Sequence, residues 1–232
     1  WAEEGLVDLV VAAPRWQSVE FDMPLTRWRA LLGDRVTLAG GLEVNYRPCT
    51  NVPARLVTAE DATGAAVAVL SGGADVVYLF NYFQHGHPKW PLPQYQRTLK
   101  SFSSLDSLLA QPRRHAVTGR DVTVPGSDYR PPLPASGTQL AFSLPLGPKP
   151  PADWRVEALV EIVGADVDAP SISVNGTAGV CGPGASVSAR NRQFTYAVPP
   201  GALSGENHDT IIVSAGVPIT LVRIEVRVIP SS

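Results

Sequence analysis

Glu43 is the side chain in this sequence that is best placed to take part in chemistry. It lies at the end of an apolar run rich in β-branched residues, 35–44, and a loop of turn-forming and polar residues, 45–48, follows. In parallel α/β architectures, catalytic groups lie at the ends of strands and in the loops after them. We therefore predict that Glu43 is a catalytic carboxylate. The alternative is a strand-end glutamate that binds the backbone of a loop or faces solvent.

Further side chains at the ends of the neighbouring predicted strands, or in the loops after them, are predicted to bind substrate: Arg15, Trp16, Asn81, Tyr82, Gln84 and Trp90. Trp16 could stack on the face of a sugar ring, because an indole offers apolar area with a polar edge. Asn81, Tyr82 and Gln84 could hydrogen-bond sugar hydroxyls. Tyr82 could equally pack against a neighbouring loop.

The sequence predicts no metal and no other cofactor. His85 and His87 would bind a metal only with further ligands, and no third ligand is evident nearby. No Gly-x-Ser-x-Gly elbow and no glycine-rich phosphate loop is present. Cys49 and Cys181 match no metal or redox spacing, so we expect two free thiols. The alternative is a bridge between them, which requires that the two halves of the chain pack closely there.

The elements that must position these residues alternate between strand and helix in the first half. Strands are predicted at 6–12, 35–44 and 75–83, and helices at 24–33, 58–71 and 94–111, the last broken near 103–104. Asp22 is interpreted as a helix cap, and Thr58 with Asp61 has the spacing of a capping box. This order favours a (β/α) barrel or an open doubly wound sheet. Three parallel strands would leave two open edges.

The second half is predicted to contain strands only, at 140–146, 154–163, 171–174, 186–198, 210–214 and 219–229. Charged and apolar residues alternate within 155–161 and 223–228, which indicates strands with one buried face. Asn175-Gly176 is typical of a tight hairpin turn. The fold class is therefore α/β plus all-β: a partial (β/α) barrel segment, 1–117, followed by an antiparallel, jelly-roll-like β-sandwich, 118–232.

Composition narrows the class of protein further. The chain has 232 residues, of which 44% are hydrophobic and 17% charged, so it can bury a sizeable core. A net charge of −2 gives no electrostatic reason to expect nucleic acid or an anionic membrane as a partner. No apolar run is long enough for a membrane span. Residues 1–5 resemble the tail of a helix more than a natural amino terminus, so we expect upstream sequence. The sequence leaves the localisation open, with a longer secreted or periplasmic precursor as one option.

Several motifs together resemble a known family: Gly5-Leu6-Val7-Asp8, Phe21-Asp22-Met23-Pro24, Gly41-Leu42-Glu43, residues 73–83, residues 105–115, Val174-Asn175-Gly176 and residues 198–207. They are similar to the last three β/α units of bacterial TIM-barrel glycoside hydrolases and to the β-sandwich often fused behind such barrels. The resemblance implies that the three parallel strands are the sixth, seventh and eighth of a barrel. Glu43 then has the position of the nucleophile, at the end of the seventh strand.

The same resemblance implies an acid/base carboxylate at the end of the fourth strand, which this sequence does not contain. We therefore expect a carbohydrate-cleaving parent and an inactive isolated chain. The expected partners are carbohydrate and either a missing N-terminal half of the barrel or further copies of this chain. The alternative is a non-catalytic carbohydrate-binding or structural β-sandwich with an attached α/β segment.

Overall fold

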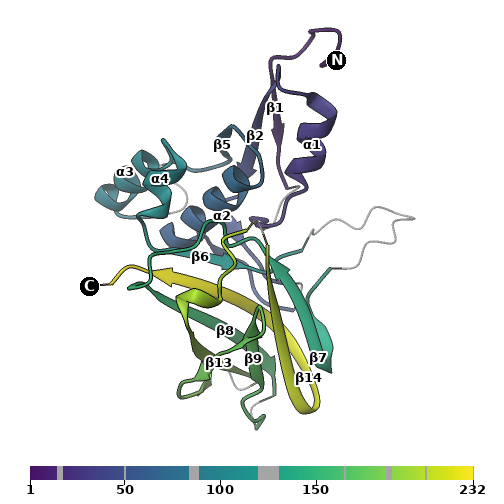
Figure 1. Cartoon of the computed structure of the whole chain (residues 1–232), viewed down its shortest axis with the longest axis vertical. Coiled ribbons are helices and arrows are strands. Elements are labelled where there is room, and N and C mark those ends of the chain that lie inside the picture. The colour runs from purple at the N-terminus through teal and green to yellow at the C-terminus, as the bar shows by residue number, and fades with distance from the viewer. Residues whose placement is uncertain are drawn as a thin grey trace.

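The protein has a small parallel α/β layer and a large antiparallel sheet, with helix α2 between them (Figure 1). The computed structural model describes residues 1–14, 18–49, 51–83, 89–119, 131–164, 166–186, 190–206 and 208–231. The predicted combination of α/β and all-β structure is confirmed at this level.

The parallel sheet consists of β1 (Leu9–Ala12), β2 (Thr37–Leu42) and β5 (Val76–Leu79), in that spatial order. All three predicted strands are thus present, and they pair in parallel. Helix α1 (Leu25–Leu32) connects the first two strands and α2 (Ala59–Ser71) the last two. Because the strands advance in one direction, right-handed crossovers place both helices on the same face of the sheet.

Helix α2 is the central element of the fold. Thr58 and Asp61 form the predicted capping box at its start, and every residue from Asp61 to Val69 is buried. Its small side chains let it approach β2 closely: a Cβ on Gly40 would lie 2.5 Å from the Cβ of Val69. The C-terminal helical stretch is divided, as predicted, into α3 (Leu92–Ser101) and α4 (Leu105–Leu109).

The prediction that Asp22 caps α1 is wrong. Pro24 occupies the N-cap position, and no side chain makes a cap hydrogen bond there. The Asp22 carboxylate is instead paired with His208, which comes from the other half of the chain. A pairing over 186 residues cannot be read from local cap spacing.

The face of the parallel sheet opposite the helices is apolar and open. Leu9 is 51% exposed, Val76 42%, Tyr78 44% and Phe80 48%. Side chains alternate between the two faces of a strand, so Val76, Tyr78 and Phe80 share one face. Among the described residues, β1 and β5 each pair only with β2, which leaves both outer edges of the sheet without a partner. The open edges expected for three parallel strands are therefore present.

The antiparallel sheet contains nine strands: β6 (Arg113–Ala116), β7 (Ala135–Leu144), β8 (Arg155–Val163), β9 (Ser171–Val174), β10 (Thr177–Ala178), β11 (Val180–Cys181), β12 (Ala185–Ser186), β13 (Asn191–Val198) and β14 (Asp209–Ile229). A short 3-10 helix, η1 (Pro200–Ala202), precedes β14. The sequence predicted a sandwich of antiparallel strands. The strands are antiparallel, but they form one continuous sheet that is nearly closed into a barrel.

The long strand β14 explains this difference. Two strands were predicted at 210–214 and 219–229, and the structure joins them into one strand of 21 residues. Its first half pairs with β7 and β9 and its second half with β6 and β8. The register against β7 shifts between Ser214 and Ile219, and such irregularities bend strands. One bent strand therefore pairs with β7 and β9 in one part of the sheet and with β6 and β8 in the other.

Two smaller predictions for the second half are confirmed. Asn175 and Gly176 adopt φ angles of 48° and 81° in the turn between β9 and β10, as a tight hairpin requires. Cys49 and Cys181 are both free, the first buried and the second exposed. The predicted boundary at 117/118 falls directly after β6, which by pairing belongs to the antiparallel sheet.

Candidate functional site

Glu43 directly follows the central strand of the parallel sheet. Pairing continues to that point, because the amide of Phe80 donates to the carbonyl of Leu42 over 3.0 Å. The Glu43 side chain is buried, and its Oε1 accepts hydrogen bonds from the backbone amide of Val44 at 2.8 Å and from Asn45 Nδ2 at 3.5 Å. The alternative interpretation of Glu43 predicted such a hydrogen bond to the backbone of a loop. This bond also fixes the direction in which the carboxylate points.

Alternation along β2 assigns Glu43 to the open face of the sheet. Gly40 lies against Val69 of α2, so its neighbour Gly41 is on the opposite face. Extending this alternation by two residues puts Glu43 on the same face as Gly41. Glu43 therefore lies at the carboxyl end of the parallel strands, and its side chain leaves the backbone on the side away from α2. Unlike the exposed side chains of that face, it is buried.

An aromatic cluster supports the loop next to Glu43. The Tyr82 hydroxyl donates to the Glu43 carbonyl at 3.3 Å, and its ring meets that of Trp90 edge-on at 5.8 Å. The indole Nε1 of Trp90 donates to the carbonyl of Val57 at 2.9 Å, and the hydroxyl of Tyr95 donates to the backbone carbonyl of Tyr82 at 2.8 Å. Burial, and then the charges of Asp61 and Glu43, raise the pKa of Tyr82 well above its usual range, so its hydroxyl stays a donor.

The other predicted substrate-binding residues have three different outcomes. Asn81 is exposed, at the end of β5, in a left-handed turn with φ of 63°. Tyr82 and Trp90 lie beside the backbone after Glu43, where they pack against each other. Arg15, Trp16 and Gln84 lie outside the described residues, as do His85 and His87. The structure thus brings Glu43, Tyr82 and Trp90 together.

Sequence reasoning missed the hairpin that follows Glu43. Strand β3 (Asn45–Tyr46) pairs with β4 (Arg55–Leu56), and Tyr46 is fully buried beneath the guanidinium of Arg55, 4.1 Å from the ring centroid. The Tyr46 hydroxyl donates to Glu225 Oε1 of β14 at 2.7 Å. Arg55 forms two hydrogen bonds, of 2.6 and 3.2 Å, with the carboxylate of Asp61.

This hairpin belongs to a buried network of charges between α2 and the antiparallel sheet. Glu225 and Asp61 are fully buried. Arg114 Nη1 lies 2.8 Å from Glu225 Oε2, and Arg227 binds Glu60 at 3.0 Å. The alternating charges of β8 and β14 predicted strands with one buried face. At the network the charged face is buried as well, because α2 and the hairpin cover it. The alternation of opposite charges in 223–227 was the available signal.

Burial and charge act in opposite directions on Glu60. Burial acts to raise the pKa of its carboxyl, but the hydrogen bonds and charge of Arg227, together with Arg114, outweigh burial and lower the pKa below its usual value. Glu60 therefore carries its negative charge in the network. Glu60, Arg114 and Arg227 are half-buried, whereas Glu225 and Asp61 are fully buried. Removing a partner of Glu225 or Asp61 would therefore be the costlier change, since it leaves a buried charge uncompensated.

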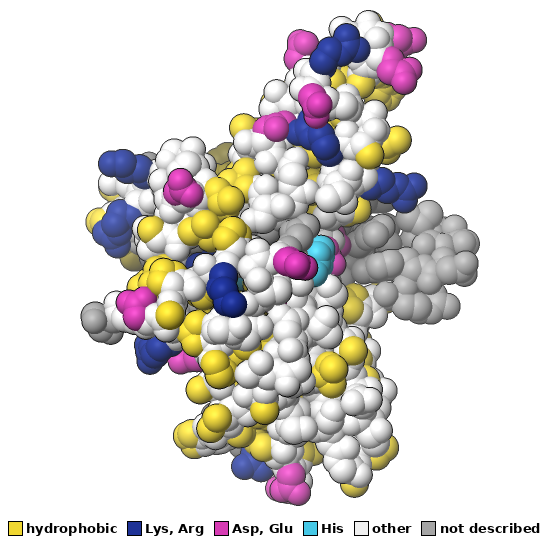
Figure 2. All heavy atoms as spheres, in the orientation of Figure 1, with side chains coloured by type: hydrophobic (Ala, Val, Ile, Leu, Met, Phe, Trp, Pro, Cys, Tyr) yellow, Lys and Arg dark blue, Asp and Glu magenta, His cyan; other side chains and the backbone are white. Residues whose placement is uncertain are grey.

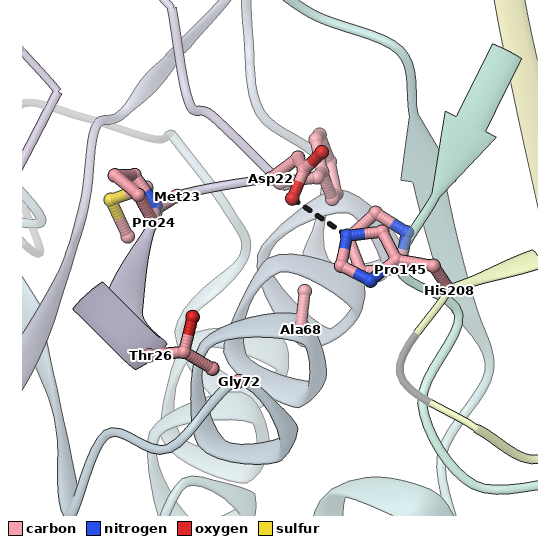
Figure 3. Close-up of a pocket in the computed structure, with 9 residues that line it drawn as sticks. Asp22, Met23, Pro24, Thr26, Ala68, Gly72, Pro145 and His208 are labelled. Carbon is pink, nitrogen blue, oxygen red and sulfur yellow. Dashed lines mark hydrogen bonds and ion pairs between the residues drawn. The ribbon is translucent and has the colours of Figure 1, made fainter. Parts of the chain in front are cut away.

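A separate small cavity, of about 80 Å³, lies on the helix-covered side (Figure 3). In Figure 3 the carboxylate of Asp22 points to the ring of His208, whose Nε2 lies 2.8 Å from Asp22 Oδ1. Thr26 and Gly72 contribute to the other wall. Figure 2 shows a histidine beside carboxylates where the two layers meet. The cavity does not include Glu43, and its exposed acid–histidine pair contributes little to stability.

The described part of the chain contains no cluster of three or more histidine, cysteine or acidic side chains that could hold a metal. No described helix is long and apolar enough to cross a membrane. Comparison of the sequence with models of known protein families gave no match, and comparison with curated proteins gave none either.

Proposed function

We propose that this chain forms the last three β/α units of a TIM-type barrel that hydrolyses glycosidic bonds, with Glu43 as a catalytic carboxylate. The observation that carries the proposal is the position of Glu43. It is a buried carboxylate at the carboxyl end of the central strand, on the face away from the helices. In (β/α) barrels the helices lie outside and the active site is built from residues at the carboxyl ends of the strands.

The order of the elements supports the same proposal. Strands β1, β2 and β5 follow one another in sequence and space, and their two connecting helices share a face. A doubly wound sheet would place helices on both faces. The sequence resemblance, which uses the same order of elements, implies that these three strands are the last of a barrel.

The proposed chemistry needs a second carboxyl group. Glycosidases use a pair, about 5–5.5 Å apart when the configuration is retained and about 6.5–9.5 Å apart when it is inverted. Glu43 would act as the nucleophile or as the carboxylate that stabilises positive charge on the sugar. The second group would come from β/α units beyond the three present here. On this proposal the substrate is an oligosaccharide or polysaccharide and no cofactor takes part.

The open face and edges of the parallel sheet are where those units would attach. Parallel strands added beside β1 and β5 would satisfy the free backbone groups and cover Leu9, Val76, Tyr78 and Phe80. A twofold-symmetric pair of this chain would join identical edges in antiparallel orientation, which does not continue a parallel barrel. We therefore propose N-terminal β/α units as the natural partner, with self-association as the substitute when they are absent.

The antiparallel sheet is better suited to a structural role than to binding sugar. Its described aromatic side chains are buried or half-buried: Phe142, Trp154, Phe194 and Tyr196. Stacking on a sugar needs an exposed ring. The sheet instead packs against α2 through β6, and its charged face holds the hairpin after Glu43. This observation favours the structural form of the alternative function.

A panel of chromogenic aryl glycosides tests the proposal. The 232-residue chain and a longer form of the same polypeptide with further β/α units are assayed in parallel. We expect the longer form to hydrolyse at least one α- or β-glycoside and the 232-residue chain to hydrolyse none. Hydrolysis by the short chain would contradict the need for a second carboxyl group from outside it. Inactivity of a folded, barrel-closed form against the whole panel would contradict the glycosidase assignment.

A further inference from the structure

We infer that Glu225, in the antiparallel sheet, is a positioning residue for Glu43 and acts through Tyr46. The inference rests on the proposed role of Glu43. It assigns to the antiparallel layer a specific task at the candidate site, which lies in the other layer.

The chain of contacts is short, and Tyr46, Glu225, Val44 and Glu43 in it are buried. The Tyr46 hydroxyl donates to Glu225 Oε1 at 2.7 Å, across 179 residues of sequence. Tyr46 is the second residue of β3, and Asn45 is the first. Asn45 and Val44 supply the two donors to Glu43 Oε1. Holding Tyr46 therefore holds both groups that orient the Glu43 carboxylate.

Glu225 is itself held in place. Its Oε2 lies 2.8 Å from Nη1 of Arg114, and its Oε1 lies 3.9 Å from Arg223 Nε and 4.0 Å from Arg55 Nη2. The side chain is fully buried, so it cannot turn toward water. Burial, and then the charge of Glu225, raise the pKa of Tyr46 well above its usual range. The hydroxyl thus remains protonated and keeps donating.

The remaining edges of the hairpin are tied to the parallel layer. The Val19 amide donates to the Asn45 carbonyl at 2.6 Å, and the Val57 amide donates to the Val44 carbonyl at 2.9 Å. These two bonds hold the carbonyls of Val44 and Asn45 to the parallel layer. Tyr46 adds a contact on the side of the antiparallel sheet. Two side chains of the hairpin hydrogen-bond β14: the Cys49 thiol donates to the Val222 carbonyl at 3.4 Å, and Tyr46 donates to Glu225. Tyr46 is the one next to Val44 and Asn45, so we expect the loss of its bond to loosen these two residues first.

The test compares Tyr46→Phe with Tyr196→Phe in the 232-residue chain. Both variants delete one buried hydroxyl, and Tyr196 donates its own to the carbonyl of Pro170 within the antiparallel half. Two quantities are measured by NMR: hydrogen exchange of the Val44 amide and the ¹³C shift of the Glu43 side-chain carboxyl. Tyr46→Phe should speed Val44 exchange by roughly tenfold, the effect of losing one hydrogen bond to a charged acceptor, and move the Glu43 signal.

The control separates positioning from general stability. Tyr196→Phe should leave the Glu43 signal in place and change Val44 exchange only as much as it changes exchange of amides in β8. Equal effects of the two variants on Val44 and Glu43, or no effect of Tyr46→Phe on either, would overturn the inference. Neither measurement involves sugar cleavage, so a failure of the glycosidase assignment would appear separately, in the hydrolysis assay.

Discussion

Gly64, in the middle of α2, lies directly against the backbone of Arg114 in β6. A Cβ atom on Gly64 would be 1.9 Å from the carbonyl oxygen of Arg114, far inside any real contact. A glycine inside a helix costs stability relative to alanine, so its presence here reflects the close approach of helix and strand. This contact brings α2 close enough to the antiparallel sheet for Arg114 of β6 to reach Glu60 of α2.

Gly64→Ala should therefore destabilise the protein although alanine favours helix. We expect the free energy of unfolding to fall by about 3 kcal/mol or more, at or above the upper end of the usual cost of overpacking. Urea unfolding followed by circular dichroism measures it. Gly201→Ala is the control, because a Cβ there meets nothing within 4 Å. That variant should stay within about 0.5 kcal/mol of wild type. Equal stability of the two variants would contradict the close packing of α2 on β6.

Because His115 is buried, we expect the protein to lose stability in acid. Burial, and then the charge of Arg113, lower the pKa of His115 to about 3. In the unfolded chain it is about 6.5, so between these values the unfolded state binds one more proton. The contribution of neutral His115 to the free energy of unfolding is complete above pH 6.5 and is lost as the pH falls toward 3. The slope is about 1.4 kcal/mol per pH unit.

The variant His115→Leu isolates this effect. Urea midpoints at several pH values between 7 and 4 should fall less steeply for His115→Leu than for wild type. Phe21, whose ring centroid lies 6.1 Å from that of His115, provides a neighbour that does not titrate. Phe21→Leu should weaken the protein by a similar amount at every pH. An unchanged slope in His115→Leu would show that other groups cause the acid lability.

The open sheet face predicts self-association of the 232-residue chain. Its exposed apolar side chains and unpaired strand edges favour contact between copies. Light scattering should show an average mass that rises with concentration, and Tyr78→Glu should reduce the rise. Val217→Glu is a matched control, because Val217 is 67% exposed but lies in β14, away from this face. A clean monomer at high concentration would argue against an interface on the parallel sheet.

Periodicity and local motifs were sufficient to predict the elements themselves. The three parallel strands, the capping box at Thr58, the divided helix after Pro91 and the Asn175-Gly176 turn are all present. Each depends on residues close together in sequence, whose backbone preferences and side-chain spacing act locally. The prediction that Glu43 ends the central parallel strand has the same local basis.

Contacts across the layers could not be predicted in this way. Asp22 has the spacing of a helix cap but pairs with His208, and Glu225 alternates like an exposed strand residue but is fully buried. In both cases the partner lies more than 170 residues away. The single sheet also depends on long-range pairing, because β14 joins strands from both parts of the antiparallel half. Charge alternation indicated a strand but not what covers it.

The most direct test of the central claim is the kcat for aryl glycoside hydrolysis by the barrel-closed polypeptide, measured for wild type and Glu43→Gln. Glutamine keeps an oxygen that can accept from the amide of Val44, so the fold should be preserved. We predict that Glu43→Gln lowers kcat on the order of 10²–10⁴-fold or more with little change in stability, as expected for a group that acts on the reacting atoms. Undiminished hydrolysis by a folded Glu43→Gln variant would contradict the assignment of Glu43.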